Sequence, residues 1–139
     1  MILIDFFLAI HVSHEAEPRL EIMKNEILDL SFDFALEIIK LVKHLKVNKE
    51  FVMSDQLLRS GTSVGANITE AQAAQSPKDF IAKMSIASKE ARESNYWLRL
   101  LDKSDYLNNY PNKLVLFNMS QSIVKLLTSI IKTSREKNK

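Results

Sequence analysis

Five residues in the middle of the sequence have side chains suited to binding nucleic acid. They recur every three or four positions: Lys89, Arg92, Tyr96, Arg99 and Lys103. In a helix this spacing places them on one face. Lysine and arginine can neutralise phosphates, and a tyrosine between them can stack on an unpaired base. The alternative is a solvated helix face partly neutralised by Glu93 and Asp102, and the pattern leaves both interpretations open.

Both glycines of the chain lie in one stretch, RSGTSVGANITEA, at residues 59–71. A Walker-type phosphate loop needs four residues between its glycines, then lysine and serine or threonine, after a strand. Here three residues separate Gly61 from Gly65, and Ala66 follows, so that motif and the dinucleotide fingerprint both fail. In a helix, the two glycines stack one turn apart and let another backbone approach closely. We therefore predict a helix-packing or subunit contact made by Ser60, Gly61, Gly65, Ala66 and Trp97.

A line of polar residues runs beside the two glycines at intervals of four, four and three: Arg59, Ser63, Asn67 and Glu70. A buried charge has to be paired. We therefore expect a hydrogen-bonded structural network, for example with Lys83 or Glu90 of the following helix. A pocket for a ligand or partner is the alternative.

Catalytic and metal-binding patterns are missing from the sequence. The chain has no cysteine, which excludes disulfides, thiolate zinc sites and cysteine nucleophiles. The Glu-x-x-His signature of di-iron bundles does not occur, and no histidine is placed to activate a serine. His11 and His14 have a spacing that could clamp a metal, but the sequence supplies no further ligands. We expect no enzyme activity, no metal and no cofactor.

Four amphipathic segments must position these residues, and we expect helices at about 26–46, 50–75, 77–103 and 111–134. The third has the clearest pattern, with core positions stepping by four and three through three heptads: Phe80, Met84, Ala87, Ala91, Ser94, Leu98 and Leu101. Its start combines a capping serine, a first-turn proline and an acidic residue: Ser76, Pro77 and Asp79. Short links between long helices predict an all-α fold, an antiparallel up-and-down four-helix bundle.

The first 22 residues differ in character from the rest. They begin with an apolar run of about a dozen residues, which lacks the positive start of a secretory signal and is too short to span a bilayer. They carry a net charge of −3, whereas the remainder carries +5. We predict an atypical extension at 1–22 upstream of a native start at Met23, the bundle at 23–134, and a frayed basic tail at 135–139. We also expect a cytoplasmic protein with no membrane partner.

Three stretches of the sequence resemble one family. They are QLLRSGTSVGANITEA (56–71), DFIAKM (79–84) and KEARESNYWL (89–98), and the match to bacterial 23S rRNA intervening-sequence proteins runs from about Met23 to Lys132. The resemblance implies an antiparallel bundle that associates into a ring, typically a homopentamer. Some members are encoded inside insertions of ribosomal RNA genes. No catalytic residues are established for the family, so none are carried over.

The resemblance also extends to the accessory variability determinants of diversity-generating retroelements. Those related proteins form basic barrels that bind nucleic acid and a reverse transcriptase. We therefore expect an oligomeric accessory protein associated with RNA or DNA, whose phosphate contacts come from the basic stripe and the basic C-terminal end. The alternative is a scaffold that docks a protein partner and has no nucleic-acid role.

Overall fold

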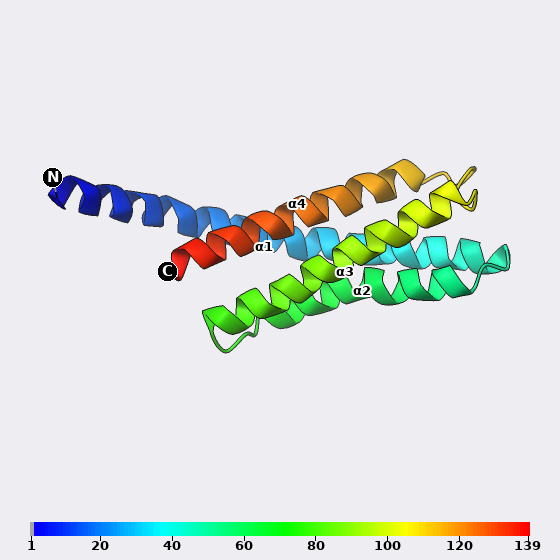
Figure 1. Cartoon of the computed structure of the whole chain (residues 1–139), viewed down its shortest axis with the longest axis horizontal. Helices are drawn as coiled ribbons and strands as arrows, with labels where there is room; N and C mark the ends of the chain where they lie inside the picture. Colours follow the sequence, from blue (N-terminus) through cyan, green and yellow to red (C-terminus); the bar gives the residue numbers. More distant parts are fainter. Residues whose placement is uncertain (1) are drawn as a thin grey trace.

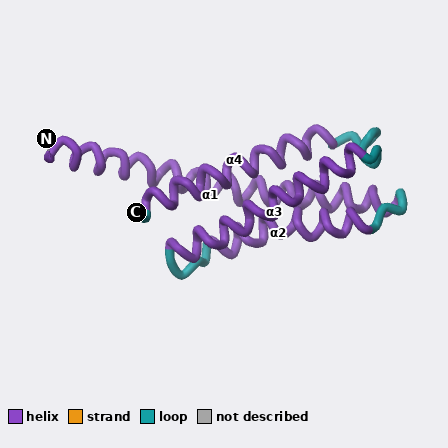
Figure 2. Tube along the Cα trace, in the orientation of Figure 1, coloured by secondary structure: helices purple, strands orange, loops and turns teal. Residues whose placement is uncertain are grey.

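Four long helices account for most of the chain in a computed structural model, which describes the backbone of residues 2–139 and the side chains from residue 16 onward. They are α1 (Ile2–Val47), α2 (Val52–Ala71), α3 (Pro77–Lys103) and α4 (Lys113–Lys137). Short turns connect them (Figure 2). In the part of the chain that the structure describes, no strand occurs.

Each helix packs against its neighbours in sequence, and α4 closes the arrangement by packing against α1. The diagonal pairs α1–α3 and α2–α4 make no comparable contact within the described residues. Consecutive helices run in opposite directions (Figure 1). The predicted antiparallel up-and-down four-helix bundle is therefore confirmed.

The core lies along the four expected stripes. In α3 the heptad positions Met84, Ala87, Ala91, Ser94, Leu98 and Leu101 are buried, and Phe80 is half-buried. In α2 the buried set includes both apolar residues and a glycine: Leu57, Gly61, Val64, Ile68 and Ala71. Since the same three-and-four spacing recurs in α4, one apolar seam joins all four helices.

The predicted start of the first helix at residue 26 is wrong, because α1 begins at Ile2 and continues through Pro18 and Met23 without a break. Leu20 and Met23 are buried in the same core as Ile27. These positions continue the inner stripe toward the N-terminus, so the helix has a packing surface beyond residue 26. Figure 1 shows the first turns of α1 extending past the C-terminal end of α4.

The turn from α1 to α2 is built from backbone and carboxylate contacts. Lys49 adopts a left-handed conformation with φ 63°, and the Glu50 N–H donates to the Leu45 carbonyl at 2.9 Å. The buried Glu50 carboxylate accepts the N–H groups of Met53 at 3.0 Å and Ser54 at 2.7 Å. It thereby satisfies two of the amide groups that a helix start leaves unpaired.

The remaining helix ends differ from expectation at three places. Helix α2 ends at Ala71 and α4 begins at Lys113, so the turns around them are longer than predicted. The expectation of a frayed tail at 135–139 is also wrong, because α4 remains helical to Lys137. Lys137 pairs with Glu17 of α1 at 2.8 Å, and this contact holds the last turn against the neighbouring helix.

Among the described helices, α4 has the length and apolarity of a membrane span. Its apolar residues include Leu116, Ile123, Leu127 and Ile130, which are buried in the bundle core. A core helix of a bundle has this composition for packing reasons alone.

Candidate nucleic-acid interface

The five residues of the predicted stripe lie on the outer surface of α3, and all their side chains are exposed. Tyr96 is 53% exposed, and its ring meets the ring of Trp97 edge-on, with centroids 5.2 Å apart. The stripe occupies heptad positions between the α2-facing and α4-facing flanks of the helix. The tyrosine face is therefore open to a stacking partner.

The four cations of the stripe have no carboxylate partner within the described residues. The neighbouring acids are engaged elsewhere. Glu93 binds Arg59, and Asp102 binds Lys113 at 2.7 Å. Glu93 and Asp102 therefore form no direct ion pair with the stripe, because each pairs with a cation of a neighbouring helix, Arg59 of α2 and Lys113 of α4.

The structure brings cations of α4 to the side of the stripe. A hollow of about 480 Å³ between α3 and α4 is lined by Arg92 and by Lys132, Arg135 and Lys139. Arg92 also lines a second hollow of about 370 Å³, together with Asn95, Gln121 and Lys125. Sequence reasoning noted these basic residues near the C-terminus without placing them beside Arg92. The sequence does not specify which helix packs next to α3, and so it could not place these α4 residues beside Arg92.

Eight cations of α3 and α4 have no ion-pair partner among the described residues, and one of them, Lys78, lies apart in the first turn of α3. The other seven are named the basic face: Lys89, Arg92, Arg99, Lys103, Lys125, Lys132 and Arg135. Glu136 also lines the larger hollow and places one negative charge there. Polar groups between the cations, including Ser85, Ser88 and Thr128, can donate to or accept from a bound chain.

The glycines lie where α2 approaches α1. A methyl group on Gly61 would meet Ile38 Cγ1 at 2.9 Å, and one on Gly65 would meet the Ser31 hydroxyl at 3.3 Å and its carbonyl oxygen at 3.4 Å. Neither glycine has a positive φ, so their value here is small size. The contact is within the chain, and no turn around an anion forms.

The other members of the predicted packing set are divided between core and surface. Ser60 is buried, and its hydroxyl lies 3.0 Å from that of Ser94 on α3. Ala66 is exposed beside the α1–α2 groove. Trp97 is half-buried, and its indole Nε1 has no hydrogen-bond partner among the residues that the structure describes.

The polar line on α2 reaches α3 only through Arg59, which pairs with the expected Glu90, and no hydrogen bond or ion pair joins its other members to α3 in the described structure. Arg59 binds Glu90 at 3.1 Å and also binds Glu93. The hydrogen bond to Glu93 is the main cause that raises the pKa of the Arg59 guanidinium. Ser63 and Asn67 donate to carbonyls of their own helix, and Glu70 is exposed.

The expected partner Lys83 binds Asp79 at 2.9 Å instead, since the two lie one turn apart on α3. The possible metal clamp of His11 and His14 lies outside the described side chains. His44 stacks near Tyr110, with ring centroids 5.1 Å apart. From residue 16 onward, no group of three histidine, aspartate or glutamate side chains could hold a metal ion.

An apolar strip on the outside of α1 was missed by sequence reasoning. It consists of Phe32, Leu36 and Ile39, whose side chains are 65%, 45% and 36% exposed. Their spacing of four and three is that of one helix face, but the longer apolar stripe that faces the core has the same spacing and masks this second face in the sequence. Phe32 borders a hollow of about 610 Å³ between α1 and α2, which Gly65 and Ala66 also line.

Comparisons with known proteins agree with this architecture. A family model described as 23S rRNA-intervening sequence protein matches residues 23–129. A crystal structure at 1.70 Å of a protein with unknown function from the S23 ribosomal protein family of Bacteroides thetaiotaomicron VPI-5482 is 51% identical, with a TM-score of 0.75. The alignment covers 79% of this chain and 98% of that one. No match was found among curated proteins. The family model spans most of the four helices, and the chain belongs to the 23S rRNA-intervening sequence protein family.

Proposed function

We propose that this chain is a non-enzymatic, oligomeric accessory protein that binds RNA or DNA through the basic face. The observation that carries the proposal is the absence of carboxylate partners for seven cations on α3 and α4 in the described structure. These side chains are exposed and gather on two adjacent helices, where Arg92 shares one hollow with Lys132 and Arg135 and another with Lys125. A polyanion is the partner that such a surface fits.

The geometry favours contact with the sugar–phosphate backbone. The cations are spread along two adjacent helices, where they can meet successive phosphates and release the counterions bound there. Tyr96 adds an exposed ring within the stripe, which can stack on an unpaired base. Binding is therefore expected to be strongly salt-dependent and only weakly dependent on base sequence.

Assembly is the second part of the proposal. The apolar strip of α1 is larger than the single apolar side chains usual on monomer surfaces, and it borders a hollow where side chains of another copy can insert. We infer that the strip packs against a second copy of this chain. The family resemblance favours a closed ring of five copies, and such symmetry multiplies weak phosphate contacts into avidity.

The direct test is a titration of fluorescently labelled RNA and DNA, single-stranded and duplex, with the full chain at salt concentrations between about 50 and 200 mM. Binding should weaken steeply with salt. Replacement of Arg92→Ala together with Arg99→Ala should weaken it by about tenfold or more. The matched control is Lys43→Ala with Lys78→Ala, which removes two exposed charges outside the basic face.

Absence of binding, or binding that is insensitive to salt and to the arginine pair, would exclude the nucleic-acid role. The apolar strip then favours the alternative, a scaffold for a protein partner. A pull-down from cell extract with and without nuclease separates the two functions. A partner that remains after nuclease treatment is bound directly by protein.

A further inference from the structure

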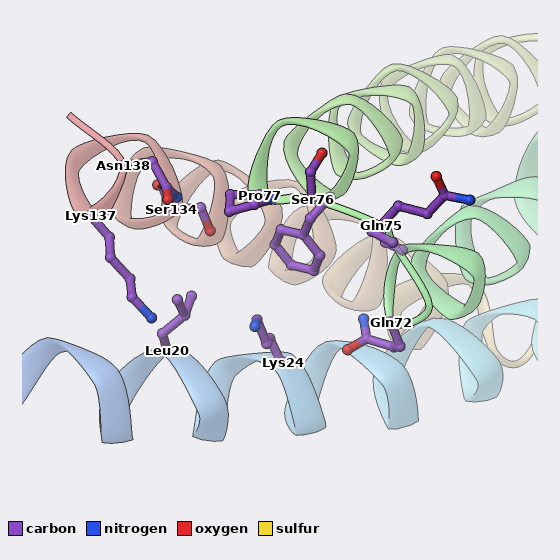
Figure 3. A pocket seen from close by; sticks show the side chains of 12 residues that line it. Leu20, Lys24, Gln72, Gln75, Ser76, Pro77, Ser134, Lys137 and Asn138 are labelled. Atoms are coloured by element: carbon purple, nitrogen blue, oxygen red, sulfur yellow. Dashed lines mark hydrogen bonds between the residues drawn. The ribbon is translucent and has the colours of Figure 1, made fainter.

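A pocket of about 390 Å³ opens at the end of the bundle where the C-terminal ends of helices α2 and α4 meet the start of α3. Leu20 and Lys24 of α1 form one side, whereas Ser134 and Lys137 of α4 and the first turn of α3 form the other (Figure 3). The volume lies within the range of small-molecule sites, about 300–1,000 Å³. None of these residues belongs to the basic face.

The pocket combines an apolar wall with positive charge. Lys24 Nζ lies 4.6 Å from the centroid of the Phe80 ring, and it has no carboxylate partner in the described structure. Lys137 lines the same pocket and pairs with Glu17. Asp79, the acidic residue in the first turn of α3, does not line the pocket, since it binds Lys83 and accepts the Gln75 N–H.

An unpartnered buried group provides the second observation. Ser134 is 3% exposed, and its hydroxyl has no hydrogen-bond partner among the described residues. Buried hydroxyls in native proteins are rarely left unpaired. Other serines in these helices donate to a carbonyl one turn earlier, as Ser94 does to Glu90. The Ser134 hydroxyl forms no such bond, and Ser134 lines the pocket, where a bound oxygen can pair with the hydroxyl once the side chain adopts another rotamer.

We propose that this pocket binds a small organic anion, a carboxylate carried on a short apolar body. The carboxylate pairs with Lys24 and reaches the Ser134 hydroxyl. The apolar body lies against Phe80 and Leu20, which supply the apolar part of the wall. The proposal does not depend on nucleic-acid binding.

Isothermal titration of the full chain tests the site with two pairs of probes. Hexanoate and benzoate carry the carboxylate, whereas 1-hexanol and benzyl alcohol keep the apolar body without the charge. Both carboxylates should bind, and each alcohol should bind at least about tenfold more weakly. Amide shifts in ¹H–¹⁵N spectra should cluster at residues around the pocket, with Ser134 and Gln75 among them.

Two variants separate recognition from stability. Lys24→Met keeps an aliphatic chain over Phe80 and removes the charge, so it should weaken carboxylate binding by about tenfold. Ser134→Ala should weaken binding while leaving the melting temperature of the unliganded protein unchanged or higher, because it removes an unpaired buried hydroxyl. The matched control is Lys78→Met. Lys78 is an exposed lysine in the first turn of α3, and it does not line the pocket.

Three results would overturn the site. They are failure of both carboxylates to bind, equal affinity for acids and alcohols, and carboxylate affinity that Lys24→Met leaves unchanged. Circular dichroism of each variant shows whether the helices are retained. A melting temperature for Lys24→Met equal to that of the parent ensures that any loss of binding reflects the removed charge.

Discussion

The α1–α2 side and the α3–α4 side of the bundle have the same helical repeat inside and different surfaces outside. On the α1–α2 side, Gly61 and Gly65 allow a close approach, and the outer surface carries apolar Phe32 and Leu36. On the α3–α4 side, the hollows between the two helices are lined by cations. The core stripe is alike in all four helices, so the outer positions are free to differ.

The difference between the two sides also reflects where the acidic residues of α3 form ion pairs. Arg59 of α2 binds both Glu90 and Glu93, which are acids of α3. These carboxylates are therefore turned toward α2, and they do not neutralise Arg92 or Arg99. The α2–α3 flank pairs its charges internally, whereas on the α3–α4 side only Asp102 and Lys113 form an ion pair among the described residues and the cations of the basic face have none.

The largest expected effect concerns the α1 strip. Phe32→Asp combined with Leu36→Asp places two charges where the proposed contact buries apolar side chains, and assembly should be lost entirely. Sedimentation equilibrium should then give the mass of one chain while circular dichroism remains helical. Val47→Asp with Val52→Asp, at the α1–α2 turn, is the matched control and should assemble normally. A parent protein that sediments as a monomer would contradict the assembly proposal.

The second effect concerns the basic face. Arg92→Glu on α3 combined with Lys132→Glu on α4 should lower nucleic-acid affinity by about 100-fold at low salt, because both cations line the same hollow. The slope of log affinity against log salt should also decrease by about two. The same double change at Lys43 and Lys78 should have a much smaller effect. Equal losses from both pairs would mean that net charge alone determines binding.

The third effect tests the close approach of α1 and α2. Gly61→Ala should lower the free energy of unfolding by about 1–3 kcal/mol, because the new methyl meets the branched Ile38 side chain near its backbone. Gly65→Ala should change it by less than about 1 kcal/mol, since the new methyl would lie 3.3 Å from the Ser31 hydroxyl, where a small shift relieves the contact, and alanine favours the helix. Urea unfolding curves measure both. A similar loss from the two changes would show that the approach is equally tight along the helix.

The smallest effect concerns the ion pairs between α2 and α3. Arg59→Met should cost less than about 1 kcal/mol of stability, because the pair is largely exposed to solvent. It leaves Glu90 and Glu93 without their partner beside the stripe, and nucleic-acid affinity should decrease by about two- to threefold. Affinity that stays constant would show that these carboxylates do not influence the basic face.

Much of the fold follows from the sequence because strong local signals coincide there. Helix α3 begins at Pro77 and ends at Lys103, as its capping residues and heptads predict. The serine at its start accepts the Asp79 N–H at 3.1 Å. The first helix extends further toward the N-terminus than expected, because the apolar run and the negative net charge of residues 1–22 suggested a separate segment. Burial of Leu20 against the other helices outweighs that signal.

The sequence by itself determined the four helices, the core-facing stripes and the small residues that thin one side of the second helix. These features depend on the spacing of side chains along one helix, which the order of residues specifies. Only the tertiary structure decided that Lys132 and Arg135 lie beside Arg92, that Arg59 draws Glu90 and Glu93 away from the stripe, and that Ser134 is buried without a partner. Those relations depend on which helices are neighbours and on how each helix is rotated about its axis. Packing brings together side chains that are far apart in the chain, so that their charges and hydrogen-bonding groups interact.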